Sequence, residues 1–440
     1  MSAGAATAIL FVGLIVVIVT GLPVVFVLGG TSLIIALFLL GPDMLGMTVN
    51  AMFSVMNNFG FLAVPLFIFM AAILERSGVA DDLYEMMHKW FGGVPGGLAM
   101  GTVVICTIFA AMSGVSAAGI VAMGLIALPN MLKRNYDKTI AIGCVAAGGG
   151  LGQLIPPSSM MIVWALTAGE SIGQMFMGGI IPGLILAVFY IIYIAIVCRI
   201  DPKKGPPLPK EERASWSEKL ATLKAVILPI FLILAVLGSM FGGIATATEA
   251  AAIGSLGAVI CALIYRRFTW QNFIKSNLDT FKLVCMVCWI VSAGITFGNV
   301  FAAVGGQQFI IGALNSLGLN RWVILIGIQL IYLFLGCLMD PWAIMILSIP
   351  IFVPLMHNLG FNTMWFGVLF IINMELGFLT PPFGPNLFYM KAIVPKGITT
   401  VDIYKSIVPF IFLQALCLAI CMAFPITITF IPGLLIKGPG

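Results

Sequence analysis

The chain has 440 residues, of which 61% are hydrophobic and only 8% are charged, and its formal net charge is +5. Because soluble proteins carry about 25% charged residues, this composition excludes a water-soluble fold and predicts an all-α polytopic membrane protein. The positive charges are not interleaved with aromatic residues, so the sequence gives no sign of nucleic-acid binding.

The first part of the chain is a series of apolar segments interrupted by glycine, proline and polar residues. Residues 5–40 are too long for one membrane span at a rise of about 1.5 Å per residue, and Gly21–Pro23 predicts a break within them. Residues 81–89 have the mixed composition of a short amphipathic surface helix. Residues 98–132 are again long and are interrupted by Ser113–Ser116, which predicts a hairpin that re-enters the membrane. Further spans are expected over 62–74, 139–168 and 175–197.

A basic hydrophilic segment at residues 199–224 divides the chain in two. The positive-inside rule places such a segment in the cytoplasm. We therefore expect a first repeat over residues 1–198, a cytoplasmic linker over 199–224 and a second repeat over 225–440. Spans of the second half are expected over 226–241, 247–265, 283–304, 322–339, 342–356, 364–389 and 406–431. The whole chain then has roughly ten to twelve spanning elements plus two re-entrant hairpins.

A double proline occurs twice in apolar sequence, in matching surroundings. The distance along the chain from Pro156-Pro157 to Pro381-Pro382 equals the distance between two earlier prolines, Pro129 and Pro354. Matched breaks of this kind are typical of a secondary transporter built from an internal repeat. A proline inside a helix frees backbone carbonyls, and in lipid these persist only where protein, water or an ion satisfies them. The two breaks therefore predict two halves of one ion and substrate site, although matching alone does not decide between inverted and parallel repeats.

The sequence of the first hairpin tip suggests a cation site. Ser113–Ser116 would expose carbonyl oxygens beside two hydroxyls, and oxygen ligands suit a hard cation such as Na⁺. The run Ala146–Gly150 would let backbones approach closely, and the break at Pro156-Pro157 would add free carbonyls. A stripe of small residues for helix packing is the alternative interpretation.

Asp340 is the corresponding candidate in the second half. A carboxylate within an apolar stretch costs about 2.5–3.5 kcal/mol on insertion scales, and a bound cation would offset that cost. A helix cap at the membrane surface would avoid it, so both roles are retained. Thr380, directly before Pro381, offers a hydroxyl and a freed carbonyl and is the second candidate.

Other polar residues near the breaks are candidates for binding substrate. Asn386 and Asn373 could position a substrate or another helix, and Ser158 and Ser159 occupy the matching place in the first half. We therefore assign Ser158, Ser159 and Asn386 to substrate binding. Glu249 follows a threonine ahead of an apolar run, as at a capped helix N-terminus, and is interpreted as structural. A P-loop motif is absent, so an ion gradient is the expected energy source.

Seven motifs occur in order along the chain: Phe61–Phe69, Ser77–Ala80, Met112–Ala118, Leu151–Ser158, Thr246–Ala252, Asp340–Pro341 and Gly377–Gly384. They resemble the motifs of the large membrane (M) subunit of TRAP (tripartite ATP-independent periplasmic) transporters, and the resemblance covers residues 7–431. The first hairpin tip lacks one hydroxyl that the family often has, so the ligands expected there are backbone carbonyls and Ser116.

This resemblance implies an elevator-type transporter of the bacterial inner membrane, driven by two or more Na⁺ ions. Two inverted repeats would each give a re-entrant hairpin and a broken helix to a mobile transport domain beside a fixed scaffold, as in the ion-transporter superfamily. The implied partners are a small four-helix Q subunit, a periplasmic substrate-binding protein, and an organic acid anion such as a dicarboxylate or sialic acid. By position, the first Na⁺ site would use Ser113, Gly114, Ser116, Gly150, Gly152 and Pro156, and the second Asp340, Gly377, Thr380 and Pro381.

Three other functions remain open at this point. A stand-alone sodium/carboxylate symporter would work without a binding protein. A non-transporting subunit would anchor a partner complex. The third is a channel, although two hairpins that end inside the membrane fit a gated binding site better than an open pore.

Overall fold

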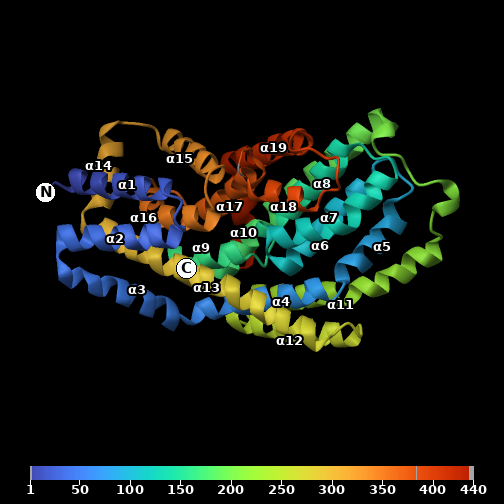
Figure 1. Ribbon diagram of the computed structural model, residues 1–440, viewed down its shortest axis with the longest axis horizontal. Helices are drawn as coiled ribbons and strands as arrows, with labels where there is room; N and C mark the ends of the chain where they lie inside the picture. Colours follow the sequence, from blue (N-terminus) through green and yellow to red (C-terminus); the bar gives the residue numbers. More distant parts are fainter. Residues whose placement is uncertain (1, 383, 436–440) are drawn as a thin grey trace.

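The computed structural model describes residues 2–382 and 384–435, which form α-helices and short 3₁₀ turns without a β-strand (Figure 1). This confirms the predicted all-α fold. The helices of the first half are α1 (Ala3–Val19), α2 (Val24–Leu40), α3 (Gly46–Asn57), α4 (Ala63–Arg76), α5 (Val79–Phe91), α6 (Gly97–Ser113), α7 (Ser116–Lys133), α8 (Lys138–Gly150), α9 (Ser159–Ala168) and α10 (Ile172–Ile200). Those of the second half are α11 (Trp216–Phe241), α12 (Ala247–Ile264), α13 (Trp270–Ala303), α14 (Gly306–Ser316), α15 (Arg321–Gly336), α16 (Pro341–Asn358), α17 (Thr363–Leu379), α18 (Pro385–Ile393), α19 (Thr400–Ala423) and α20 (Ile426–Leu435).

Glycine and proline end the helices where the sequence predicts breaks. Gly21 has a φ of +77°, which only glycine adopts readily, and Pro23 directly precedes α2. The long apolar run at the N-terminus is therefore two helices. Likewise Gly114, at a φ of +61°, separates α6 from α7, which form the first hairpin.

The helices of the two halves recur at the spacing of the double prolines. The first residue of α7 and the first residue of α16 are as far apart in sequence as the two double prolines. The same distance separates the last residues of α7 and α16, and the first residues of α8 and α17. Each half thus contains a hairpin, a helix that breaks at a double proline, and a long helix after the break. These are α6–α7, α8–α9 and α10 in the first half, and α15–α16, α17–α18 and α19 in the second.

The two sets of helices interlock. The segment after each break packs on the hairpin of the other half: α9 on α16, and α18 on α7. The first part of each broken helix packs on the long helix of the other half: α8 on α19, and α17 on α10. Together these ten helices form one body with a shared core. Most of the remaining helices pack on one another, notably α4 on α12 and α13, and α2 on α13 (Figure 1), whereas α20 packs on α10 and α5 packs on both α6 and α11.

The expected linker 199–224 contains the end of α10 at Ile200 and the first part of α11, which a capping box between Ser215 and Glu218 starts, and the span expected over 226–241 is the second part of α11. Two expectations about boundaries need correction. The last expected span is two helices, since Pro425 lacks the N–H needed to continue α19. The expected span over 283–304 is the second part of a longer helix, α13.

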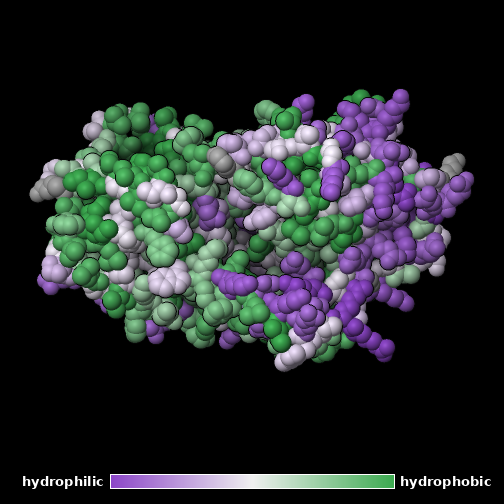
Figure 2. All heavy atoms as spheres, viewed as in Figure 1, coloured by the Kyte–Doolittle hydropathy of each residue, from purple (hydrophilic) through white to green (hydrophobic). Residues whose placement is uncertain are grey.

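Fewer helices than expected are long enough to cross a membrane alone. Among the described residues, seven helices meet that length and composition, or eight if the two bent parts of α11 form one span. Six further apolar helices have 10–17 residues, because glycine and proline end them early. Hydrophilic residues gather at the end of the molecule that carries the connection from α10 to α11 (Figure 2).

Candidate functional site

The first hairpin tip contacts the first double-proline break through its backbone. A Cβ atom on Gly114 would collide with the carbonyl oxygen of Pro157, and one on Gly152 would lie 2.9 Å from the carbonyl oxygen of Val115. The hydroxyl of Ser159 donates a hydrogen bond of 3.3 Å to the carbonyl oxygen of Gly114. Glycine is therefore required at two places where main chain meets main chain.

Glycines at the end of α8 allow this close contact. Gly149 packs against the backbone of Ile120 in α7, and Gly119 packs against Gly149 in turn. The helix then ends at Gly150, continues as a 3₁₀ turn, and gives way to Pro156-Pro157, whose peptide bond is cis. The break predicted from the double proline is thus present, with α9 starting only at Ser159.

The serines at this break have structural partners. The hydroxyl of Ser158 caps α9 by accepting from the amide of Met161 at 3.4 Å. The hydroxyl of Ser113 donates to the carbonyl oxygen of Val115 at 3.4 Å, within the tip. Ser116 is the first residue of α7 and is buried. The tip and the break therefore bring together the predicted residues of the first Na⁺ site, with the exception that Gly150 faces α17 and α18.

The second hairpin meets the second broken helix at a pair of glycines. A Cβ atom on Gly377 would lie 2.9 Å from the Cα atom of Gly336, the last residue of α15. Gly377 follows Gly152 at the same spacing as the second double proline follows the first, so each half uses the equivalent glycine to approach its own hairpin. The peptide bond of Pro381-Pro382 is also cis.

Asp340 lies at the tip of the second hairpin as the N-cap of α16. Its Oδ2 atom accepts from the amide of Trp342 at 3.0 Å and from that of Ala343 at 3.4 Å. The capping role is therefore present, and the residue is exposed at the tip. The hydroxyl of Thr380 donates to the carbonyl oxygen of Leu376 at 2.7 Å. The lone pairs of the Thr380 hydroxyl oxygen therefore point away from Leu376. Phe383 of this motif lies outside the described residues.

The asparagines near the second break are buried and have different surroundings. Asn373 donates at 2.7 Å to the side-chain oxygen of Gln329, which ties α17 to α15. Asn386 is completely buried in α18, and neither of its side-chain polar atoms has a partner in the described structure. Glu249 forms a capping box with Thr246 at the start of α12, the geometry that the sequence suggested for it.

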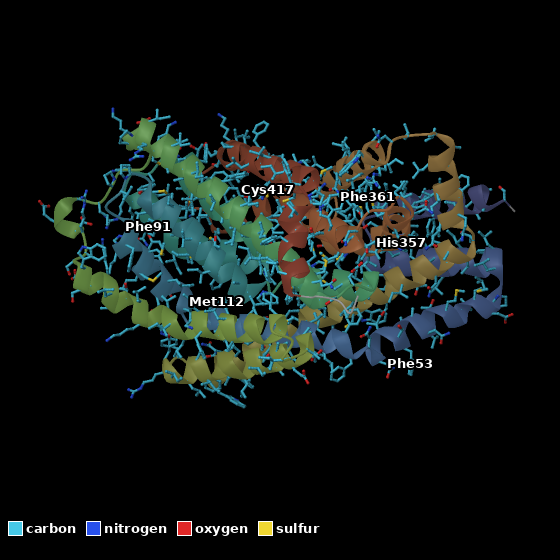
Figure 3. The ribbon with its side chains drawn as sticks, turned by 180° about the vertical axis from the view of Figure 1, so that it is seen from behind. Phe53, Phe91, Met112, His357, Phe361 and Cys417 are labelled. Atoms are coloured by element: carbon cyan, nitrogen blue, oxygen red, sulfur yellow. The ribbon has the colours of Figure 1, made fainter. Side chains whose placement is uncertain are left out.

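A cavity of about 280 Å³ lies beside the first hairpin tip. One wall consists of Ser113 and Val115 of the tip and of Tyr389 of α18, and the opposite wall includes Glu75 of α4 and Asp279 of α13. The tip lies near the middle of the molecule, as the label on Met112 shows (Figure 3). The cavity thus lies between helices of the interlocked body and the outer helices α4 and α13.

Ser158, Ser159 and Asn386, which the sequence assigned to substrate binding, do not line this cavity. Sequence analysis missed its outer wall, because Glu75 and Asp279 are far apart in the chain and neither belongs to a motif with known spacing. Arg76 forms an ion pair with Asp279 across this wall.

Comparison with known proteins gives the family. Residues 11–427 match the family described as "Tripartite ATP-independent periplasmic transporter, DctM component". The chain belongs to this family of TRAP transporter large membrane subunits. It is 32% identical to the C4-dicarboxylate TRAP transporter large permease protein DctM of Pseudomonas aeruginosa, over 93% of each chain. It is 30% identical to the ectoine TRAP transporter large permease protein TeaC of Halomonas elongata, over 95% of this chain and 97% of that one.

Solved structures share the fold of this TRAP subunit at low sequence identity. The YdaH transporter of Alcanivorax borkumensis superposes with a TM-score of 0.61 at 12% identity, over 91% of this chain and 90% of the other. MtrF of Neisseria gonorrhoeae gives a TM-score of 0.63 at 14% identity, over 88% and 85%. The apolar spans and the family together identify a multi-pass protein of the inner membrane.

Proposed function

We propose that this chain is the transport subunit of a sodium-driven TRAP system that takes up a small organic acid anion by an elevator movement. The observation that carries the proposal is the pair of matched contacts at Gly152 and Gly377, where a hairpin backbone meets a broken helix. Broken helices offer unpaired carbonyl oxygens to cations and positive helix ends to anions.

The interlocked helices are suited to move as one body. α9 and α18 each pack on the hairpin of the other half, so neither hairpin shifts without the other. The cavity between this body and the outer helices marks the surface along which it would slide. Figure 3 supports an inverted arrangement, because Phe91, before the first hairpin, and His357, at the end of the second, lie toward opposite ends.

We propose two Na⁺ sites at the hairpin tips. In the first, carbonyl oxygens of the tip and the break, with Ser113 and Ser116, would ligate the ion. In the second, Asp340 and Thr380 would do so beside Gly377. Ser158, Ser159 and Asn386 would contribute to binding the substrate once the transporter leaves the state described here.

Named relatives support the partners and the substrate class. The isethionate TRAP transporter permease protein DctMQ of Oleidesulfovibrio alaskensis is 30% identical over 94% of this chain, and this chain covers 65% of it. The name and the additional length of that relative agree with a fused Q subunit, and we propose a small Q subunit as a partner of this chain. The names of relatives include C4-dicarboxylate and ectoine transporters, so we propose a carboxylate cargo delivered by a periplasmic binding protein.

Reconstitution in liposomes tests this function. Liposomes are prepared with this chain, a small Q subunit and a periplasmic substrate-binding protein. Uptake of a radiolabelled C4-dicarboxylate is then measured under an inward Na⁺ gradient and under a matched K⁺ gradient. Uptake that needs Na⁺ and all three proteins supports the proposal. Uptake by the chain alone would favour the stand-alone symporter, and equal uptake in K⁺ would refute sodium coupling.

A further inference from the structure

A groove separates the outer arm of the second hairpin from the long helix that follows the second break. α15 and α19 lie along the same edge of the molecule (Figure 1), and a cavity of about 460 Å³ lies between them, with residues of α17 at its base. Ile326 and Leu330 at its rim are exposed. Because α19 is long and apolar enough to cross a membrane, the groove opens toward lipid.

The first half of the chain is closed at the corresponding place, where α6 packs directly on α10. In the second half, three alanines of α19, one turn apart, line the groove: Ala415, Ala419 and Ala423. The residues of α10 at the same places, counted from the matched prolines inside the two helices, are the larger Val188, Ile192 and Ile196. The second half therefore leaves room for a ligand that the first half does not.

Two side-chain amides lie in the wall of this apolar groove. Gln329 of α15 is 4% exposed and Asn373 of α17 is 0% exposed. Asn373 Nδ2 donates to the backbone oxygen and to Oε1 of Gln329, both at 2.7 Å. Gln329 Nε2 is left as a donor and Asn373 Oδ1 as an acceptor, and neither has a partner among the described residues. Since buried polar atoms are almost always paired, these two atoms indicate a bound polar group.

We propose that the groove binds a single-chain amphiphile that ends in a hydroxyl group, the chemistry of a long-chain alcohol. The hydroxyl oxygen accepts from Gln329 Nε2 and its hydrogen is donated to Asn373 Oδ1, so one group pairs both amide atoms. The hydrocarbon chain lies beside the alanines of α19 and extends toward Trp322, which also lines the groove. Trp322 and Gln329 are two turns of α15 apart, about 10 Å at 1.5 Å per residue.

Three other occupants fit the groove less well. An acyl chain of a bilayer phospholipid would fill the apolar part but leave both amide atoms unpaired. Water would pair these atoms but would not occupy the apolar remainder, because apolar cavities stay dry. None of the described residues that line the groove is charged, so a carboxylate or a phosphate would have no ionic partner there.

Occupancy of the groove would link α15 with α19. α15 is the outer arm of the hairpin whose tip carries Asp340, so a bound chain would hold this arm against the rest of the interlocked body. The groove is lined by none of the residues that we propose as Na⁺ ligands. The inference therefore does not depend on sodium coupling.

Photolabelling of the full chain in lipid nanodiscs tests the proposal. The probe is an octanol with a diazirine on its chain, and mass spectrometry of peptides locates the labelled residues. We expect labelling of α15 and α19 beside the groove that excess 1-octanol displaces and excess octane does not. Ala419→Phe fills the groove from an exposed position and should abolish this labelling. Leu416→Phe, also exposed on α19 but outside the groove, is the matched control and should retain it.

Removal of both amides tests the polar contacts. Replacement of two hydrogen-bonded partners by apolar groups of similar size leaves no unpaired partner behind and is nearly neutral for stability. Gln329→Leu/Asn373→Leu should therefore fold, and the probe concentration that half-saturates labelling should rise about tenfold, which corresponds to about 1.4 kcal/mol. If this variant does not fold, Ala419→Phe with its control decides the matter.

Three results would overturn the proposal. One is labelling spread over the apolar surface without enrichment at the groove, or labelling there that Ala419→Phe leaves unchanged. Another is equal displacement by octane, which would assign the groove to lipid chains. The last is an unchanged half-saturating concentration in Gln329→Leu/Asn373→Leu, which would show that the amides do not hold the hydroxyl group.

Discussion

Gly336 and Gly377 bring the second hairpin and the second broken helix together backbone against backbone. A Cβ atom on Gly377 would lie 2.9 Å from Gly336 Cα, and one on Gly336 would lie 3.2 Å from Gly377 Cα. Real Cβ atoms do not approach backbone at the shorter of these distances, so a larger residue at Gly377 must push the hairpin away. The pair therefore sets the position of the tip that carries Asp340.

We expect Gly377→Ala to displace the second hairpin. Overpacking in a tight contact costs about 1–3 kcal/mol, and the displaced tip should also raise the Na⁺ concentration needed for half-maximal uptake. Thermal unfolding in detergent and Na⁺-dependent uptake in liposomes measure the two effects.

Gly327→Ala is the matched control, because a Cβ atom at this position of α15 meets nothing within 4 Å. It should leave stability unchanged or raise it by up to about 1 kcal/mol, because alanine favours the helix more than glycine does. If Gly377→Ala behaved like this control, the glycine contact would not position the hairpin.

The two roles open to Asp340 can be separated by two substitutions. Asparagine caps a helix about as well as aspartate, whereas alanine loses about 1 kcal/mol. Asp340→Asn should therefore keep the stability of the wild type but weaken Na⁺ activation, because the negative charge is lost. Asp340→Ala should lose both stability and Na⁺ activation. Wild-type Na⁺ activation in Asp340→Asn would leave the residue as a helix cap alone.

The sequence predicted the breaks and hairpins because their signals are local. Pro156-Pro157 and Pro381-Pro382 stop helices wherever they occur, and the constant spacing between matched prolines relates the halves without knowledge of contacts. The end of α19 shows the limit of this approach: Pro425 also breaks a helix, but it has no matched partner in the first half that would draw attention to it.

The environment of the site residues could not be predicted in the same way. Ser158 has the right type and place for a ligand, yet its hydroxyl caps α9. Glu375 and Gln414 meet only because α17 packs on α19, and the segment of chain between them carries no signal of that contact. Partners that are distant in sequence decide whether a polar group is free to bind.

Acid should destabilise the protein through His88, which lies on the amphipathic helix α5 outside the membrane-spanning helices. Burial lowers the pKa of His88 from 6.5, and the positive charge of Arg134 lowers it further. The unfolded chain then binds more protons than the folded one as the pH falls through 6.5, so stability is lost on acidification.

His88→Gln removes this titration and should flatten the decline. Apparent midpoints of thermal unfolding, measured from about pH 7.5 to about pH 5.5 around the ordinary histidine pKa, give the comparison. Parallel curves for the wild type and His88→Gln would show that other groups cause the acid sensitivity.

An ion pair ties α5 to the connection between α12 and α13. Arg267 donates to both carboxylate oxygens of Asp82, at 2.8 and 2.9 Å, and also to the carbonyl oxygens of Ser77 and Gly78. Arg267 is more than a third exposed, so solvent reduces the value of the pair, and we expect Asp82→Asn to cost about 1 kcal/mol. Arg267→Lys should cost a similar amount, because a lysine does not make the paired contacts of a guanidinium group.

Glu85→Gln provides the comparison on the same helix, because Glu85 pairs with Lys89 one turn away at a more exposed position. That change should cost no more than about 0.5 kcal/mol. If Asp82→Asn were as mild in thermal unfolding, the attachment of α5 would depend on its apolar face rather than on Arg267. Additive effects in the double variant Asp82→Asn/Arg267→Lys would lead to the same conclusion, whereas residues that interact directly should give a double variant little worse than either single one.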